Sequence, residues 1–274
     1  MLNRRSGPRH MPTVCIVMPA YNEATRIEQT LASIALYIAD GAPIGPVILA
    51  DDGSDDDTIN IAERAASSHE LPMEVLRFPH RGKASTVRAA MLHVADRVGA
   101  DYLMMLDADD ELPIHQLDGV DWSPNLDTIY IGRRVGAAGG REAARPTFLR
   151  RTMSFTMRAA SRALLGIGFP DTQCGFKLFP RAIAADLFGQ QRSTGWTFDA
   201  ELLYIADRVS NLPIVEIPVV WRPRGASRVR PAAAVISGLS MFGTAFRRLR
   251  RVYRPVAGGD VSAGAATPGA VLPT

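Results

Sequence analysis

Four carboxylates lie within five consecutive positions of the chain, in the segment YLMMLDADDELP at residues 102–113. Like charges this close repel one another unless water or a cation separates them. Because side chains alternate along an extended chain, Asp107 and Asp109 fall on one side, where their oxygens suit Mg²⁺ or Mn²⁺. The alternative is a solvated turn whose acidic residues start a helix. The four residues are Asp107, Asp109, Asp110 and Glu111.

A second acidic cluster, DDGSDDDT at residues 51–58, also follows an apolar run. Gly53 and Ser54 indicate a tight turn, and residues 55–57 are typical of the N-cap and first turn of a helix. That interpretation leaves Asp51 and Asp52 unexplained. A carboxylate at this position could accept the ring N–H of a uracil or the amino group of another base.

A basic segment, HRGKASTVRAAM at residues 80–91, places Arg81, Lys83 and Arg88 around a glycine at a predicted helix start. A helix N-terminus with added cations attracts phosphate. The spacing differs from the GxxxxGK[ST] pattern, so a Walker loop is excluded. The alternative is a basic surface helix with no ligand.

These clusters must be positioned by the elements around them, and the apolar pattern alternates between strand and helix. Such alternation predicts a parallel sheet with right-handed crossovers, in which ligands bind beyond the carboxyl ends of the strands. Polar clusters at residues 19–23, 51–58 and 107–111 follow three of the strands, so we expect them to meet at one edge. Strands are expected at 14–20, 47–50, 73–78 and 102–107, and helices at 24–39, 58–68 and 84–98.

The second half of the chain is less regular. We predict strands at 128–131 and 214–220 and helices at 147–165, 181–188 and 198–209. The fold class is therefore α/β, with a mostly parallel sheet flanked by helices in a single domain over residues 12–230. Residues 1–11 and the small-residue tail 255–274 are expected to be disordered.

Composition sets broad limits on function. The chain has 274 residues, 47% of them hydrophobic, with no apolar stretch long enough for a membrane span and no signal-peptide pattern. Cys15 and Cys174 are too isolated for a disulfide framework, so a cytoplasmic location is the default expectation. Of the 31 basic residues, only Lys83 and Lys177 are lysines. Arginine suits phosphate contacts, but acidic clusters at the predicted ligand edge argue against nucleic acid.

Residues 231–254 carry a separate signal, a basic amphipathic helix. Its apolar residues recur at steps of four and three, and arginines lie to the side or opposite. Such a helix can lie on an anionic bilayer, which would make the protein peripheral at the cytoplasmic membrane face. The alternative is that the apolar stripe packs on the protein's own core. The stripe comprises Val235, Leu239, Phe242, Phe246, Leu249 and Tyr253, and the arginines are Arg247, Arg248, Arg250, Arg251 and Arg254.

Taken together, PAYNE, DDGSDDDT, RGK and DADDE, in this order and spacing, resemble the family 2 glycosyltransferases of the GT-A fold. The segments DTQCGFKLF (171–179), WTFDAELLYIA (196–206) and EIPVVWR (216–222) resemble the dolichyl- or polyprenyl-phosphate glycosyl synthases, especially their UDP-glucose-using branch. The resemblance covers residues 12–230. It departs from the family at Gly82-Lys83-Ala84, where Gly-Lys-Gly is common.

The resemblance implies a UDP-sugar donor carrying glucose or an N-acetylhexosamine, Mg²⁺ or Mn²⁺ as cofactor, and inverting transfer to a polyprenyl phosphate. Two alternatives stay open. One keeps the fold and donor but uses a soluble small-molecule acceptor, as in natural-product glycosylation. The other is a non-catalytic nucleotide-sugar-binding protein, against which the intact acidic motif argues.

The resemblance also assigns residues. Residues 19–23 supply the base and ribose pocket, with Asp51 or Asp52 reading the base, and segment 171–177 borders the sugar and acceptor, with Trp196 close behind. Asp107 faces the nucleotide or the metal, Asp109 binds the metal directly, and Glu111 is the third ligand. The nucleotide-binding set is Pro19, Ala20, Tyr21, Glu23, Asp51, Asp52, Lys83, Asp107, Ala108 and Asp109, and Arg134 and Arg151, or their neighbours Arg133 and Arg150, grip the acceptor phosphate.

The acceptor decides which catalytic groups are needed. A phosphate monoester is already anionic, so positioning and neutralisation by arginines suffice without a strong general base. An alcohol would need a base, and Asp199 or Glu201 is the candidate. Asp110 points away from Asp109 along the alternating chain and is expected to be structural.

Overall fold

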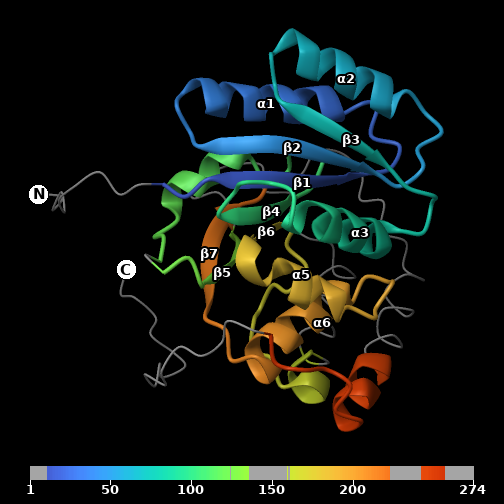
Figure 1. Ribbon diagram of the computed structural model, residues 1–274, viewed down its shortest axis with the longest axis vertical. Coiled ribbons are helices and arrows are strands. Elements are labelled where there is room, and N and C mark those ends of the chain that lie inside the picture. Colours follow the sequence, from blue (N-terminus) through green and yellow to red (C-terminus); the bar gives the residue numbers. More distant parts are fainter. Residues whose placement is uncertain (1–10, 124, 136–158, 160, 223–241, 257–274) are drawn as a thin grey trace, which may run out of the picture.

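The computed structural model describes residues 11–123, 125–135, 159, 161–222 and 242–256, which contain one seven-stranded sheet between two layers of helices (Figure 1). The strand order is β3-β2-β1-β4-β6-β5-β7. All neighbouring strands except those paired with β6 run parallel. The α/β fold and the mostly parallel sheet that the sequence predicts are confirmed.

The first half of the sheet follows the expected strand–helix alternation. Strands β1 and β4 lie at the centre and are buried on both faces, which explains their continuous apolar sequences VCIVMPA and YLMML. The elements are β1 (Val14–Ala20), α1 (Ile27–Ala39), β2 (Ile44–Asp51), α2 (Thr58–Ser68), β3 (Met73–Arg77), α3 (Lys83–Ala95) and β4 (Tyr102–Leu106).

The second half contains a strand that sequence analysis missed, β6 (Phe176–Pro180), which runs antiparallel to both of its neighbours. The apolar run FKLFP is short, contains Lys177 and ends in proline, so its pattern resembles a loop. Up to residue 220, the other described elements are a 3₁₀ turn (Ile114–Gly119), β5 (Ile129–Val135), a π-helical turn (Ser161–Leu165), α5 (Arg181–Gly189), α6 (Phe198–Tyr204) and β7 (Ile214–Val220). Helix α6 continues as a π-helical turn (Ile205–Val209).

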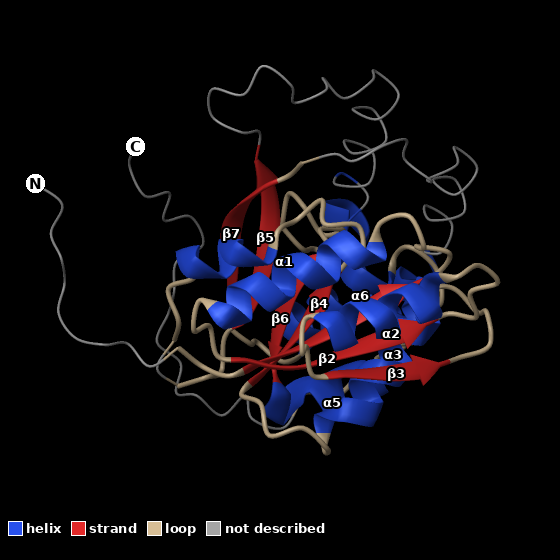
Figure 2. Cartoon of the chain, turned by 90° about the horizontal axis from the view of Figure 1, so that it is seen from above, coloured by secondary structure: helices blue, strands red, loops and turns tan. Residues whose placement is uncertain are grey.

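Helices cover both faces of the sheet (Figures 1 and 2). Successive side chains of a strand point to opposite faces, so alternate residues of the central strands pack against the two helical layers. Ile16 and Met18 of β1 pack in the cluster that includes α1 and α2, whereas Cys15 and Val17 pack toward α3, α5 and α6. Burying one large aliphatic side chain contributes about 1.5–3 kcal/mol. Two apolar layers therefore hold the sheet and fix the ends of its strands.

Several predictions concern residues outside the described ranges. These are the chain ends, most of the helix predicted at 147–165 with Arg150 and Arg151, and the first part of the amphipathic segment with Val235 and Leu239. Its second part is described and is helical over residues 242–249. Among the described residues, no helix combines the length and apolar character required to cross a membrane.

Candidate active site

The carboxyl ends of β1, β2 and β4 meet at one edge of the sheet, and β5 ends there too. Strand β6 begins at this edge because it runs in the opposite direction, and its pairing of Leu106 with Phe176 brings residue 175 opposite Asp107. Asn22 after β1 bonds to Ser54 and Asp55 after β2, so the first two polar clusters are in contact. Arg26 links the first cluster to Asp109 after β4. The edge therefore collects the three clusters that the sequence places there.

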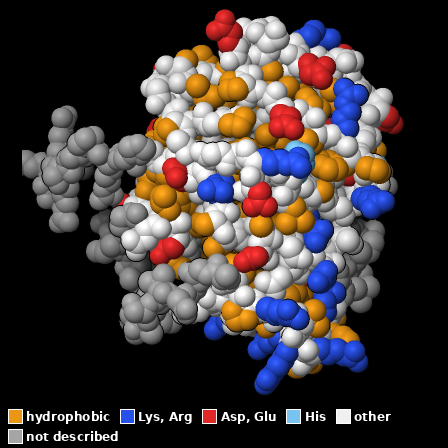
Figure 3. Space-filling view, in the orientation of Figure 1, with side chains coloured by type: hydrophobic (Ala, Val, Ile, Leu, Met, Phe, Trp, Pro, Cys, Tyr) orange, Lys and Arg blue, Asp and Glu red, His pale blue; other side chains and the backbone are white. Residues whose placement is uncertain are grey.

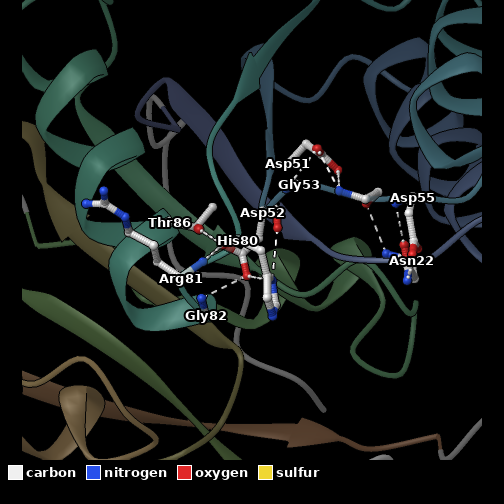
Figure 4. A network of polar contacts seen from close by, with 10 residues as sticks. Asn22, Asp51, Asp52, Gly53, Asp55, His80, Arg81, Gly82 and Thr86 are labelled. Carbon is white, nitrogen blue, oxygen red and sulfur yellow. Dashed lines mark hydrogen bonds and ion pairs between the residues drawn. The ribbon is translucent and has the colours of Figure 1, made fainter.

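Asp52 forms the centre of a hydrogen-bonded network that fixes the loop before α3 (Figure 4). Its Oδ1 accepts from the backbone N–H of Arg81 at 2.9 Å and from the Thr86 hydroxyl at 2.6 Å. Its Oδ2 accepts from the backbone N–H of Gly82 at 2.9 Å and lies 2.9 Å from Nδ1 of His80. A carboxylate offers about four acceptor positions, so Asp52 is saturated by the protein.

Asp51 is also engaged, in closing its own turn. Its Oδ2 accepts from the backbone N–H groups of Gly53 and Ser54, both at 3.1 Å. Gly53 has φ of 76°, and a Cβ there would lie 3.0 Å from the backbone N of His80, so the turn requires glycine. Reading a base with Asp51 or Asp52, as predicted, would compete with these bonds.

Residues 19–23 divide into buried and accessible members. Pro19 and Ala20 are buried within β1, and Tyr21 is 38% exposed. The Tyr21 ring stacks on His80, with centroids 4.1 Å apart and planes 22° from parallel. Glu23 accepts from Arg26 at 2.8 Å. The Tyr21–His80 pair provides a flat aromatic surface at the edge, suitable for stacking a base.

Lys83 at the start of α3 contacts the carboxylate that follows β4. Its Nζ lies 2.5 Å from Oδ1 of Asp107. Burial alone would raise the pKa of Asp107, but Lys83, with Lys177 and Arg134 farther away, lowers it below its usual value. Burial likewise opposes the charge of Lys83, but Asp107 raises the pKa of that ammonium group. The two groups form a charged pair at neutral pH.

Asp109, unlike Asp107, has no cation close to its carboxylate among the described residues. Its nearest cation among the described residues, Arg26, has a guanidinium nitrogen 4.0 Å away. Burial, followed by the negative charges of Asp107 and Glu111, raises the pKa of Asp109 to about 6. Ala108, between the two aspartates, is buried, and its carbonyl accepts from Thr30. The cluster after β4 is therefore short of positive charge at Asp109.

A divalent cation would supply the positive charge that Asp109 lacks. Within the described ranges, no three or more His, Cys, Asp or Glu residues are grouped to hold a metal ion. One oxygen of Glu111, the predicted third ligand, accepts from Nε1 of Trp221 at 2.7 Å. Mg²⁺ commonly uses one or two carboxylates and takes its other ligands from water and substrate phosphates. Asp107 and Asp109 fit a cation that is completed by a diphosphate ligand.

A buried ion pair lies behind Lys83 and Asp107. Lys177 of β6 is 2.8 Å from Asp199 of α6, and their side chains are 1% and 7% exposed. Lys177 also donates to the Cys174 carbonyl. Burial raises the pKa of Asp199 in spite of this pairing. Both lysines of the chain thus lie at the site, and that scarcity is the signal by which the sequence could have identified Lys177.

Arg134 at the end of β5 is paired with Asp171. Its Nε and a terminal nitrogen lie 2.7 and 2.8 Å from the two carboxylate oxygens, and its backbone N–H donates to the same group. Its charge lowers the pKa of Asp107, whereas that of neighbouring Arg133 acts on Glu216. Of the adjacent pair, Arg134 is therefore the residue next to the cluster. Arg151 and Arg150 lie outside the described residues.

The segment DTQCGFK, residues 171–177, contacts Asp107 through Gly175. A Cβ added to Gly175 would lie 2.1 Å from Oδ2 of Asp107, a distance no real contact shows. The Gln173 amide donates to the carbonyl of Trp196, whose side chain is 47% exposed. Gly175 therefore permits the close approach that orients the carboxylate. The family resemblance implies that this segment borders the sugar and acceptor, but the role of its glycine is visible only in the structure.

Asp110 is separated from its neighbours by its conformation. It is 7% exposed and has φ of 51°, a left-handed value that Asp tolerates better than most residues. Asp109, by contrast, has a side chain that is 24% exposed. The two adjacent aspartates therefore differ in exposure, but the chain forms a turn after β4, so the alternation of an extended strand does not account for the difference.

Comparison with known proteins identifies the family of this chain and several of its relatives. The Glycosyl transferase family 2 model matches residues 15–188. A dolichyl-phosphate beta-glucosyltransferase of Trichomonas vaginalis is 32% identical over 78% of this chain, and the alignment spans 65% of that relative's length. The enzymes of that name from Drosophila melanogaster and Homo sapiens are 31% and 29% identical, each over 79% of this chain and 69% of the relative.

Solved structures share the fold at lower identity. Glucosyl-3-phosphoglycerate synthase from Mycobacterium tuberculosis, in complex with Mn²⁺, UDP and phosphoglyceric acid, superimposes with a TM-score of 0.60 at 19% identity, over 90% of this chain and 81% of that one. Mannosyl-3-phosphoglycerate synthase from Rubrobacter xylanophilus gives 0.54 at 16% identity, over 88% and 74%. These similarities support the GT-A architecture.

Proposed function

The chain belongs to glycosyl transferase family 2, and from that premise we propose that it transfers a hexose from a UDP-sugar to a polyprenyl phosphate, with inversion and with Mg²⁺ or Mn²⁺. The sugar is glucose or an N-acetylhexosamine. The relatives named dolichyl-phosphate beta-glucosyltransferase support the acceptor class and favour glucose.

One observation carries the metal-dependent part of the proposal. Asp109 lies beside Asp107 at the end of β4 with a raised pKa and its nearest described cation 4.0 Å away. A buried carboxylate in this state gains stability when a cation binds. In a family of transferases, the cation and diphosphate of a nucleotide sugar match that requirement. The complex of a fold relative with Mn²⁺ and UDP agrees with it.

The donor is assigned to the first half of the edge. Tyr21 and His80 offer a stacking surface for the base, and Lys83 offers a cation to the diphosphate. Asp52 holds the loop that carries His80 and Lys83, so its contribution is positioning. A bound divalent cation would absorb the charge that develops on the leaving diphosphate.

The acceptor is assigned to the second half. A phosphate monoester is anionic and attacks without losing a proton to a strong base, so it needs neutralisation and alignment. Arg134 is the cation available at this end, and its pairing with Asp171 fixes the direction of its guanidinium group. Asp199 is already held by Lys177, which supports a role in fixing the site's charge instead of one as general base.

The test is a transfer assay with radiolabelled donors. We expect label from UDP-glucose or UDP-N-acetylglucosamine to enter the organic phase with a polyprenyl phosphate acceptor when Mn²⁺ is present, and not when it is chelated. Label confined to the aqueous phase with a soluble phosphorylated acceptor would favour the alternative substrate class. Transfer from a GDP-sugar, or transfer that survives chelation, would contradict the proposal.

A further inference from the structure

The described C-terminal segment, residues 242–256, has an outer apolar face that the other described residues leave exposed. Its helix spans residues 242–249. Phe242, Phe246 and Leu249 follow at steps of four and three, which places them on one side of the helix. They are 60%, 53% and 80% exposed. These three residues are called the outer face below.

The inner side of the same helix is anchored to the catalytic domain. Thr244 is buried, and the guanidinium of Arg247 donates to Glu201 at 3.1 Å. Tyr253, after the helix, is buried and donates its hydroxyl to the same carboxylate at 2.5 Å. Glu201 is fully buried in α6 and also accepts from two backbone N–H groups at residues 192 and 193.

This anchoring corrects the simple amphipathic stripe drawn from the sequence. Tyr253 leaves the stripe and packs against Tyr204, with ring centroids 5.8 Å apart. Phe242, Phe246 and Leu249 do not pack on the core. An unanchored helix could rotate to bury its apolar side, whereas this one is held with that side outward.

The charged side chains within this segment all have one sign. Residues 242–256 contain five arginines and no acidic residue. Arg250, Arg251 and Arg254 are exposed and make no ion pair with a described carboxylate, and Arg250 lies over the ring of Phe246 at 4.5 Å. Figure 3 shows basic and hydrophobic side chains together at the lower end of the molecule. Exposed apolar side chains can insert into a bilayer while neighbouring arginines pair with its anionic head groups, so this segment is complementary to an anionic bilayer surface.

The helix lies close to the substrate edge. Ser193 contacts both Thr244 and Arg247, with polar atoms 3.3 Å apart in each case. Two residues earlier, buried Gln191 donates to the carbonyl of Ala84 at 3.0 Å, next to Lys83. Segment 191–193 therefore joins the helix to the start of α3, where the Lys83–Asp107 pair lies.

We propose that the outer face and its arginines bind the surface of an anionic phospholipid bilayer, with Phe242, Phe246 and Leu249 inserted among the lipid head groups. Glu201, through Arg247 and Tyr253, holds the helix so that the substrate edge lies near the bilayer. The binding itself does not depend on the reaction proposed above. Its use in delivering a lipid-linked acceptor does rest on that reaction.

Sedimentation of the full chain with vesicles tests the surface directly. We expect binding to vesicles of phosphatidylcholine mixed with phosphatidylglycerol, weaker binding to phosphatidylcholine alone, and release by salt. Phe246→Glu/Leu249→Glu should lower the partition coefficient at least about tenfold, because it removes two inserting groups and adds negative charge. The matched control is Leu36→Glu/Val215→Glu, which changes two other exposed apolar residues away from the segment.

Three results would overturn the proposal. They are absence of wild-type binding to anionic vesicles, equal binding by Phe246→Glu/Leu249→Glu, and an equal loss in the control variant. A dimer that Phe246→Glu/Leu249→Glu dissociates would instead identify the outer face as a contact between copies. No donor sugar is present in these measurements, so a failure of the proposed reaction is seen separately, in the transfer assay with detergent-solubilised acceptor.

Discussion

Asp52 and Asp109 are acidic residues at the same edge of the sheet, but their surroundings are opposite. Asp52 is 3% exposed, and its four acceptor positions are filled by donors of the loop before α3. Asp109 faces two other carboxylates, and its nearest described cation is 4.0 Å away. Sequence alone makes the two look alike. Asp52 holds the loop before α3 in place, whereas Asp109 has no close cation among the described residues, which is why we propose it as the metal ligand.

The largest effect should come from removing the charge-deficient carboxylate. Asp109→Asn is expected to lower metal-dependent transfer about a thousandfold, since the cation that offsets the leaving-group charge loses a ligand. Asp110→Asn should retain most of the activity, because Asp110 is buried, is not one of the two proposed metal ligands, and asparagine also tolerates φ of 51°. Initial rates with and without Mn²⁺ measure both. Equal losses would show that the two aspartates do not have separate roles.

The next effect concerns the residue that orients Asp107. Gly175→Ala should lower the transfer rate up to about a hundredfold, because its Cβ would displace a carboxylate from its working position. Gly168→Ala is the matched control, since a Cβ there meets nothing within 4 Å. Rates and Mn²⁺-induced shifts of the melting temperature would be compared. Wild-type rates for Gly175→Ala would mean that Asp107 need not be held so closely.

Replacing Asp52, whose acceptor positions are all filled, should mainly lower the unfolding free energy of the protein. Asp52→Asn replaces one acceptor oxygen with an NH₂ group that faces donors, which is expected to cost about 1–3 kcal/mol of unfolding free energy. Thermal or urea unfolding measures this loss. Asp55→Asn, at an exposed position nearby, should stay within about 0.5 kcal/mol of wild type. If Asp52→Asn left the unfolding free energy unchanged, the proposed difference between Asp52, which stabilises the fold, and Asp109 would be wrong.

The smallest expected effect is a pH dependence of the unfolding free energy, measured in the absence of metal. The pKa of Asp109 is raised in the folded protein from 3.8 to about 6, so the folded state binds a proton more tightly than the unfolded state. The contribution of protonated Asp109 to the unfolding free energy is therefore complete below about pH 4, and it is lost as the pH rises to about 6. Metal-free Asp109→Asn should be more stable than wild type at pH 7 and similar to it near pH 4. Unfolding curves at the two pH values test the sign.

The predictable and unpredictable parts of this molecule differ in the range of their interactions. Strands β1 to β4 and their helices carry local apolar periodicity, so the sequence predicts them and the edge where their polar ends meet. Strand β6 and the Lys177–Asp199 pair depend on chain segments far apart in sequence, and no local pattern reports them. The hydrogen-bonded network of Asp52, which would compete with base reading by Asp51 or Asp52, has the same long range, since the donors Arg81, Gly82 and Thr86 are about thirty residues away.

The position of β6 also affects the order in which the site can be assembled during synthesis. Residues 102–106 of β4 hydrogen-bond with residues 176–180, and β5, made earlier, joins the sheet on the outer side of β6. While the chain emerges from the ribosome, β1 to β4 can pair locally, but Gly175 and Lys177 reach Asp107 only after β6 has left the exit tunnel. The acidic edge is therefore completed late in translation, because a nascent chain that ends before β6 has Lys83 and Arg134 but lacks Gly175, which lies against Asp107, and Lys177, whose charge also lowers the pKa of Asp107.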